Sequence, residues 1–402
     1  MSDFSATRRS FLSRIAAAVG TAPYAAAAFG AARRGPYRVG VIGHTGRGNF
    51  GHGLDTVWLD LSETSIVGVA DADSRGLQDA RQRLRVAAGY ADYRTMLREL
   101  QPDLVAVCCR HPDQHRAMTI AAIEAGAQGV YVEKPFCRTP GEADAVRAAC
   151  EKHSAKVAVA HRNRYHPVLE QIDGLIQSGR IGKVLELRGR GKGDQRGGSE
   201  DLWVLGSHVM DLLHYFGGPP TSCSAVVRID GRPVVREDVR PGNEALGPLA
   251  GNEVHARFEM ANGVIAYFDS IANDGTKNAG FGLQIVGSAG VIRIACDRDP
   301  LAHLQLGNPF KPSAKPAAWQ PISSAGVGQA ETRAGFISEV VHHVVPVRDL
   351  IDAIETDRQP RCGVAEGAMT VEMICSVFAS HQQGGRAVDL PLSKRDNALT
   401  RL

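Results

Sequence analysis

The sequence of 402 residues predicts an α/β protein in which a doubly wound parallel sheet precedes an α+β domain with a large, mostly antiparallel open sheet. Three observations predict this order. Short apolar runs alternate with helical segments between residues 37 and 160, as in parallel sheets with crossover helices. The first run leads into a glycine-rich turn. Beyond residue 184, apolar and polar residues alternate one by one, and an Asn-Gly hairpin turn appears.

Residues 1–32 have the pattern of a twin-arginine signal peptide. Arg8 and Arg9 precede an alanine-rich apolar run, which Gly20 and Pro23 interrupt. We therefore expect a periplasmic or otherwise exported protein that uses the twin-arginine export machinery and has no stable membrane insertion. The alternative is a chance arginine pair in a disordered tail.

Composition excludes several other classes of function. A formal net charge of +3 is too small to suggest a nucleic-acid partner. The eight cysteines show no C-x-x-C spacing, which favours free thiols over a disulfide framework. The histidine pairs His342-His343 and His161…His166 lack ligand spacing and carboxylate partners, so we expect no metal.

The first predicted strand, Tyr37 to Ile42, opens a domain that we expect to span residues 36–160. A strand followed by a glycine-rich turn and a helix is typical of dinucleotide binding, because the backbone can then approach the pyrophosphate at the helix N-terminus. The match to G-x-G-x-x-G is imperfect, with threonine at the middle position, and a glycine-rich loop without a ligand is the alternative. The candidate cofactor-binding residues of the turn are Gly43, Thr45, Gly46, Arg47 and Gly48.

The second predicted strand, Ile66 to Ala70, ends at Asp71. An acid about twenty residues beyond the turn is placed to bind the adenine ribose hydroxyls. It favours NAD over NADP, because it would repel a 2′-phosphate. The third strand, Leu104 to Cys109, leads into a loop whose His111 and His115 are further candidates for cofactor binding. His115 could also contact the substrate, or it could be a helix-start histidine with no ligand.

The next strand, Val130 to Val132, is followed by Glu133-Lys134-Pro135. Ligands of open α/β sheets bind at the carboxyl ends of strands, where Lys134 is placed. A lysine there can exchange a proton with a substrate oxygen beside a bound cofactor, and burial can lower its pKa toward neutrality. Glu133 is a candidate cofactor-binding residue. The alternative is an ordinary surface Glu–Lys pair at a strand end.

The order of glycine turn, Asp71, Glu133-Lys134-Pro135 and a second domain resembles the Gfo/Idh/MocA family of oxidoreductases, which includes glucose–fructose oxidoreductase and inositol dehydrogenase. The resemblance covers nearly everything after the leader. It implies a Rossmann domain that binds NAD(P) and a substrate-binding and oligomerisation domain, here residues 161–402. It also implies that Lys134 contacts both the nicotinamide side of the cofactor and the substrate.

Three further candidates are expected near the substrate, and the resemblance implies two of them. Arg164 and Tyr165 match an Arg-aromatic segment of the family, although a salt bridge between the domains would also explain the arginine. Trp203 can stack on a sugar face or can simply belong to the core. We expect the substrate to be a small carbohydrate or polyol.

The family often shows Asp-x-Gly-x-His, in which the aspartate and histidine assist the lysine in proton transfer. His208 matches the histidine and is the second candidate catalytic residue, but Val204 stands at the aspartate position. Valine cannot bind a proton. Either Lys134 and His208 suffice, or Asp201 or Tyr165 compensates, or alcohol oxidation has been lost.

The rest of the second half predicts a large sheet closed by helices. Strands flank the turns at Asn262-Gly263 and Gly287–Gly290, and helices are expected over 340–356 and 365–381. Residues 297–335 are rich in proline and glycine and predict irregular structure. A sheet with one face on helices leaves the other free for homo-oligomerisation.

These features predict an exported NAD-dependent oxidoreductase that acts on a sugar, cyclitol or polyol derivative and recycles a tightly bound cofactor. Two alternatives stay open. One is an NAD-dependent glycosidase that works by oxidation, elimination and reduction. The other is a non-catalytic nucleotide-binding protein, which Val204 favours.

Overall fold

A computed structural model describes residues 35–402, so the predicted signal peptide lies outside the described residues. The first half contains a six-stranded sheet in the order β3-β2-β1-β4-β5-β6. Every neighbouring pair is parallel. This order confirms the doubly wound sheet, and it places the carboxyl ends of the central strands together at the point where the strand order reverses. The strands are β1 (Tyr37–Ile42), β2 (Thr64–Ala70), β3 (Gly89–Tyr90), β4 (Leu104–Val107), β5 (Gly129–Val132) and β6 (Lys156–Val159).

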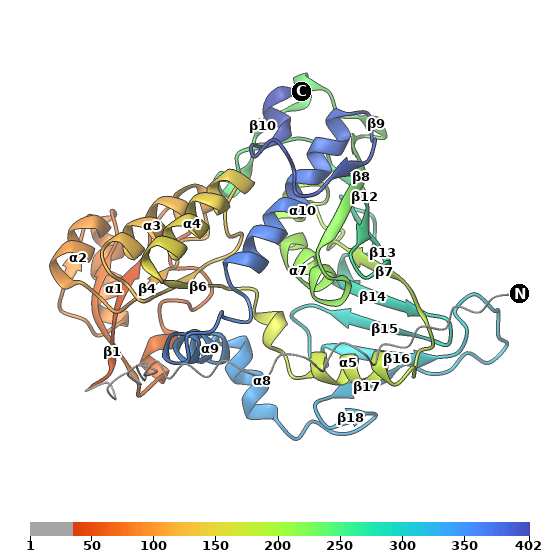
Figure 1. The fold of residues 1–402 in the computed structure, drawn as a ribbon, viewed down its shortest axis with the longest axis horizontal. Coiled ribbons are helices and arrows are strands. Elements are labelled where there is room, and N and C mark those ends of the chain that lie inside the picture. The colour runs from red at the N-terminus through yellow and green to blue at the C-terminus, as the bar shows by residue number, and fades with distance from the viewer. Residues whose placement is uncertain (1–34) are drawn as a thin grey trace, which may run out of the picture. The chain divides into compact units, whose positions relative to one another are not determined.

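Helices cover both faces of this sheet (Figure 1). One core contains apolar side chains of α2, α3, α4 and α10, and the other contains side chains of α1, the short 3-10 helix η1 and α9. Helix α9 therefore belongs to the second half of the sequence but packs on the first sheet. The bounds are α1 (Ser74–Arg83), α2 (Tyr93–Leu100), α3 (His115–Glu124), α4 (Pro140–His153), η1 (Val57–Asp60), α9 (Val344–Glu355) and α10 (Val364–Gln382).

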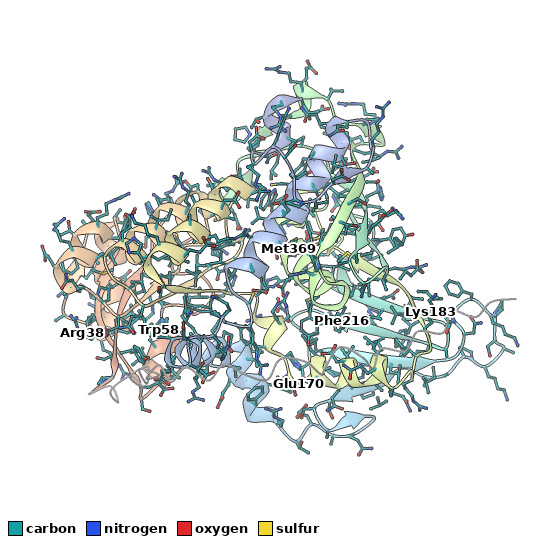
Figure 2. The ribbon with its side chains drawn as sticks, in the orientation of Figure 1. Arg38, Trp58, Glu170, Lys183, Phe216 and Met369 are labelled. Atoms are coloured by element: carbon teal, nitrogen blue, oxygen red, sulfur yellow. The ribbon has the colours of Figure 1, made fainter. Side chains whose placement is uncertain are left out.

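The helix expected directly after the glycine turn is absent from the described residues 43–60, which form turns and the four-residue η1. Gly48 and Gly51 have φ values of +87° and +66°, outside the helical region. A Cβ on Gly48 would lie 2.4 Å from the backbone nitrogen of Arg110, so the segment packs backbone to backbone on the loop after β4. Trp58 of η1, labelled in Figure 2, instead makes an edge-to-face contact with Tyr131 of β5, and both rings share a core with residues of α9.

The second half contains the predicted large sheet of eleven strands, in the order β18-β17-β16-β15-β14-β7-β13-β12-β8-β19, with β9 beside β8. All pairs are antiparallel except β7 with β13. The predicted hairpin joins β12 to β13 across Asn262-Gly263, and β14 pairs with β15 as expected. The larger strands are β7 (Val184–Arg190), β8 (Pro220–Ile229), β12 (Glu253–Met260), β13 (Ile265–Ile271), β14 (Gly282–Gly287) and β15 (Gly290–Ala295), and the short ones at the β8 edge are β9 (Arg232–Pro233) and β19 (Val388–Asp389).

Two predictions for the C-terminal part were wrong in detail. Residues 297–335 are not wholly irregular, because β16 (Ala302–Leu306), β17 (Gln320–Ser323) and β18 (Gly326–Val327) extend the sheet. The helix expected over 340–356 is divided into α8 (Ala334–Val341) and α9, since His343 adopts a left-handed conformation with φ +66°. Three further helices belong to this half of the chain. In sequence, α5 (Val168–Gln177) comes before β7, and α6 (Ser199–Val204) and α7 (Gly206–Gly217) come between β7 and β8.

In residues 35–402, no helix combines the length and the apolar character needed to cross a bilayer. The eight cysteines are free thiols, as predicted, and all except Cys150 are buried.

Candidate active site

Lys134 lies at the carboxyl end of β5, where the sheet meets the second half of the chain. Its side chain is 8% exposed, and Nζ donates a hydrogen bond of 3.1 Å to the backbone carbonyl of Val204. Val204 is the last residue of α6, and carbonyls in the last turn of a helix have no partner within the helix. The position where the family often has aspartate thus offers Lys134 a carbonyl oxygen rather than a carboxylate.

The neighbouring Glu133 is also buried, and the two charges shape each other. Burial lowers the pKa of the Lys134 ammonium, and the carboxylate of Glu133 opposes that shift. Burial alone would raise the pKa of Glu133, but a hydrogen bond with His52 Nδ1 (3.0 Å) and the charge of Lys134 outweigh it and lower the pKa. Glu133 is therefore ionised at neutral pH, and Lys134 loses its proton more readily than an exposed lysine.

His208, in the first turn of α7, lines the same cleft as Lys134. Burial and the nearby charge of Lys134 hold the pKa of His208 well below its ordinary value, so the imidazole is neutral at pH 7. Its Nδ1 is buried and has no hydrogen-bond partner within the described residues. The structure therefore brings the two predicted catalytic residues together.

The cleft around this pair is small, with a volume of about 80 Å³. Typical ligand pockets occupy about 300–1,000 Å³, so the cleft must widen to admit a sugar and a nicotinamide ring. Sequence reasoning missed several lining residues, since they come from segments far apart in the chain. The lining consists of His52, Glu133, Lys134, Ala160, Arg162, Leu205, His208, Asp297 and His343.

The glycine turn lies over the end of β2, with Asp71 buried beneath it. The backbone N–H of Thr45 donates to both oxygens of Asp71 at 3.1 Å, and its hydroxyl donates to Oδ2 at 2.7 Å. The N–H of Asp73 also donates to Oδ1 at 3.0 Å. The carboxylate expected to receive ribose hydroxyls is thus held by Thr45, and Thr45 must move before that carboxylate can accept a ligand.

The other candidates of the first half differ in their surroundings. The side chain of Arg47 pairs with Asp113, while Gly46 is open to solvent and the ring of Phe50 packs on Gly43. Burial lowers the pKa of His111, which lies on the loop after β4.

His115 holds the backbone around the lysine. It is fully buried, its Nε2 lies 2.6 Å from the carbonyl oxygen of Cys109, and its Nδ1 lies 2.9 Å from that of Pro135. The ring joins the end of β4 to the segment after Lys134 and has no nitrogen left for a ligand.

The three predicted substrate residues of the second half lie outside the cleft lining. Arg164 binds the carboxylate of Asp211 through Nε (2.9 Å) and its terminal nitrogen (2.8 Å). Tyr165 is buried, and its hydroxyl receives the N–H of Cys362 at 3.2 Å. Trp203 is wholly buried in the core. Arg162 faces the cleft instead, where it pairs with Asp297 at 3.0 Å.

One trio of potential metal ligands occurs among residues 35–402, namely His161, Asp211 and Cys362. Asp211 is already paired with the guanidinium of Arg164, which lowers the pKa of the carboxyl and supplies the positive charge that a metal ion would bring. We therefore assign no metal to this trio.

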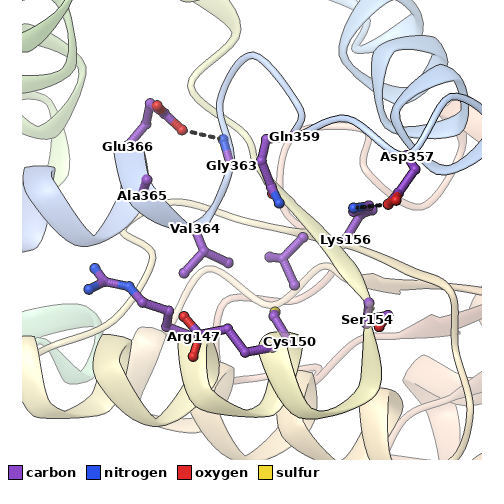
Figure 3. Close-up of a pocket in the computed structure, with 13 residues that line it drawn as sticks. Arg147, Cys150, Ser154, Lys156, Asp357, Gln359, Gly363, Val364, Ala365 and Glu366 are labelled. Carbon is purple, nitrogen blue, oxygen red and sulfur yellow. Dashed lines mark hydrogen bonds and ion pairs between the residues drawn. The ribbon is translucent and has the colours of Figure 1, made fainter. Parts of the chain in front are cut away.

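A larger hollow, of about 440 Å³, lies between α4, β6 and the start of α10 (Figure 3). Two of its charged side chains already have partners within the protein, as Lys156 pairs with Asp357 at 2.7 Å and Glu366 accepts the N–H of Gly363 at 2.8 Å. Its lining includes neither Lys134 nor His208, and it carries no comparable chemistry.

Comparison with known proteins agrees with this arrangement. Residues 37–161 match the model of an oxidoreductase family with an NAD-binding Rossmann fold, and residues 169–293 match the GFO/IDH/MocA C-terminal domain. The chain belongs to the Gfo/Idh/MocA family. A curated relative, D-apiose dehydrogenase of Paraburkholderia graminis, is 24% identical over 83% of this chain and 85% of its own length. Levoglucosan dehydrogenase of Pseudarthrobacter phenanthrenivorans is 25% identical over 66% of this chain and 77% of its own length.

Solved Gfo/Idh/MocA structures share the fold. Levoglucosan dehydrogenase in complex with NADH and L-sorbose superposes with a TM-score of 0.70 at 20% identity, and it covers 89% of this chain and 100% of the solved chain. The WlbA dehydrogenase of Bordetella pertussis in complex with NADH and UDP-GlcNAcA gives a TM-score of 0.65 at 18% identity over 89% and 99% of the two chains. At these identities the similarity shows the fold alone.

The types of residue at the ends of β1, β2 and β5 are suitable for binding a dinucleotide. The turn of β1 contains Gly46 and Gly48 with positive φ, and it lies beside the acid at the end of β2. The unpartnered Nδ1 of His208 and the buried Lys134 lie at the end of β5, two strands along the sheet. Residues from Gly43 to Gly48, with Asp71, would hold the adenosine and pyrophosphate, and Glu133 and Lys134 would lie on the nicotinamide side.

Proposed function

We propose that this protein is an exported NAD-dependent dehydrogenase that oxidises a CH–OH group of a small carbohydrate or polyol. The observation that carries the proposal is the placement of Lys134 and His208 in one cleft at the carboxyl end of β5. The names of the relatives, which include dehydrogenases of apiose and levoglucosan, support a carbohydrate as the substrate class.

The residues of the cleft can manage the proton of the reaction. Oxidation of an alcohol removes a hydride from carbon and a proton from oxygen. When bound, the nicotinamide supplies the hydride acceptor. Lys134, whose pKa burial lowers, takes the hydroxyl proton, and the carbonyl of Val204 orients its Nζ. His208, neutral at pH 7, can accept or donate a hydrogen bond to the same substrate oxygen.

Export, predicted from Arg8-Arg9, adds a physical constraint. Outside the cytoplasm little free NAD is present to exchange, so the cofactor should stay bound and be recycled within one catalytic cycle. Internal recycling is also compatible with glycoside cleavage through transient oxidation.

Replacing Lys134 tests the proton role. Lys134→Met should lower turnover by a factor of about 10²–10⁴, the usual contribution of a general acid–base group. Its folding and its bound nucleotide should match those of the wild type. The assay uses protein purified from the exported fraction, with D-apiose, levoglucosan and myo-inositol as substrates, and nucleotide released by denaturation is identified by absorbance and mass. Lys183→Met, at an exposed lysine far from the cleft lining, is the control. Full activity in Lys134→Met would refute the mechanism.

A non-catalytic role is the second candidate, and the valine at position 204 favours it. Near-stoichiometric nucleotide in wild-type protein, with no turnover of polyols, sugars or glycosides, would support that role. Protein without nucleotide that also binds none on addition would contradict both candidates.

A further inference from the structure

His343 lies in the cleft but has no counterpart among the predicted site residues. It is the residue at which the chain passes from α8 to α9, so the second half of the sequence places it against the parallel sheet. Its φ of +66° is unusual for a residue with a side chain, and such strain tends to persist where function requires it. The side chain is 2% exposed and lines the cleft together with Lys134 and His208.

One ring nitrogen of His343 is fixed by the sheet. The hydroxyl of Tyr131, in the middle of β5, lies 2.6 Å from Nδ1 of His343. Burial lowers the pKa of His343 to about 4, so the ring is neutral at pH 7 and carries one proton. A tyrosine hydroxyl whose own pKa burial raises well above the ordinary value is a donor, and Nδ1 is then the acceptor. The proton of the imidazole consequently resides on Nε2.

That Nε2–H has no partner. It is buried, and no acceptor within residues 35–402 reaches it. A buried donor without a partner costs free energy of folding, and a ligand oxygen that accepts its hydrogen bond can recover that free energy. Two other donors of the cleft already have partners, because Arg162 is paired with Asp297 and His52 with Glu133.

We infer that His343 is a substrate-binding residue whose Nε2–H donates a hydrogen bond to an oxygen of the bound carbohydrate or polyol, and that Tyr131 is a positioning residue that fixes this tautomer. The inference rests on the proposed function for the identity of the ligand. His343 would thus add a hydrogen-bond donor to the cleft from the α8–α9 junction. That junction lies in the second half of the sequence, whereas Lys134 follows a strand of the first half.

The tautomer can be measured without any substrate. In protein labelled with ¹⁵N-histidine, the ring signals of His343 are assigned by their loss in His343→Gln. We expect a proton on Nε2 and an unprotonated Nδ1 in the wild type. In Tyr131→Phe the preference should weaken, since the donor to Nδ1 is gone. A proton on Nδ1 in the wild type would overturn the inference whatever the enzyme's activity.

Binding provides the second measurement. Dissociation constants for D-apiose, levoglucosan and myo-inositol are determined by calorimetry in the Lys134→Met background, where turnover is expected to be too slow to interfere. For the sugar that binds best, His343→Gln should raise the constant about tenfold, the equivalent of one lost hydrogen bond of about 1.4 kcal/mol. The matched control is His342→Gln, which changes the exposed neighbouring histidine. Equal affinity in the two variants would overturn the inference.

Binding constants, read together with the oxidation assay of the proposed function, separate this inference from that function. Binding that depends on His343, in an enzyme that shows no oxidation of the same sugar, would support the donor and refute the dehydrogenase. Oxidation with an unchanged KM in His343→Gln would support the dehydrogenase and refute the donor.

Discussion

At the scale of single residues, the contact between Thr45 and Asp71 is the least expected feature of the nucleotide half. The sequence predicted both residues as cofactor ligands, but the structure shows them bound to each other. The glycine pattern and the acid can be found from spacing. Their mutual hydrogen bonds cannot, because they depend on how the turn folds over the end of β2.

We predict that Thr45→Val increases the affinity for NAD several-fold. The substitution keeps the shape of the side chain but removes the 2.7 Å hydrogen bond from its hydroxyl to Asp71, so the carboxylate becomes easier to release to the ribose. Calorimetric titration of nucleotide-stripped protein measures the effect. The control is Thr56→Val in the same segment. The Thr56 hydroxyl donates to the carbonyl oxygen of Gly53 and not to Asp71, so the affinity should stay unchanged. Weaker binding in Thr45→Val would instead assign the hydroxyl to the nucleotide.

Some residues of the cleft could be predicted from the sequence, and others could not. Lys134 and His208 lie next to recognisable motifs, and the structure brings them together. His343, Asp297 and Arg162 carry no local signal, since a histidine pair or an isolated aspartate has the same pattern on any surface. Arg164 and Tyr165 had the expected chemistry, but Asp211 and the Cys362 backbone occupy their polar groups.

At the scale of elements, His115 links two strand ends and so determines the position of Lys134. Its ring nitrogens lie near the carbonyl oxygens of Cys109, after β4, and Pro135, after β5. This link explains why a histidine at the start of α3 is fully buried.

We expect His115→Leu to lower the free energy of unfolding by about 1–3 kcal/mol, because the backbone carbonyl oxygen to which the ring donates would lose its donor. Turnover should fall by more than the loss of folded protein explains, because the segment after Lys134 would lose its anchor. Urea titration and initial rates measure the two effects. His153→Leu, which changes an exposed histidine at the end of α4, is the control. Destabilisation without any loss of turnover per folded molecule would show that Lys134 does not depend on this link.

At the scale of the whole molecule, the neutral buried histidines make stability depend on pH. Burial lowers the pKa of His166 to about 4. The unfolded chain takes up this proton near the ordinary pKa of about 6.5, whereas the folded chain resists protonation. The free energy of unfolding therefore has its full value, as far as His166 is concerned, above pH 6.5. It decreases as the pH falls toward 4.

For His166 alone the expected loss is on the order of 3 kcal/mol, at 1.36 kcal/mol per pKa unit. His166→Asn keeps an acceptor for the N–H of Val168 but does not titrate, so its stability should fall less steeply between pH 6.5 and 4. Urea unfolding at a series of pH values compares the slopes. Parallel curves for the two proteins would contradict the assignment.

The whole fold was predictable in outline, because alternation of strands and helices and the hairpin signals are local. The packing of α9 on the first sheet was not predictable, since its apolar face would fit any open surface. Residues of α9, including Leu350 and Ile354, fill the space beside Gly129 of β5. The helix expected after β1 is missing, and α9 helps to cover the face on which η1 lies.

During synthesis, α9 becomes available to cover this face of the parallel sheet only after the sheet itself has been made. Val344, the first residue of α9, leaves the ribosome 185 residues after Val159, the last residue of β6. At about 5–20 residues per second, this delay lasts roughly 10–40 seconds. Throughout that interval the nascent parallel sheet has one apolar face that its permanent neighbour has not yet reached. Molecular chaperones that bind exposed apolar segments would have this face as their target until translation is nearly complete.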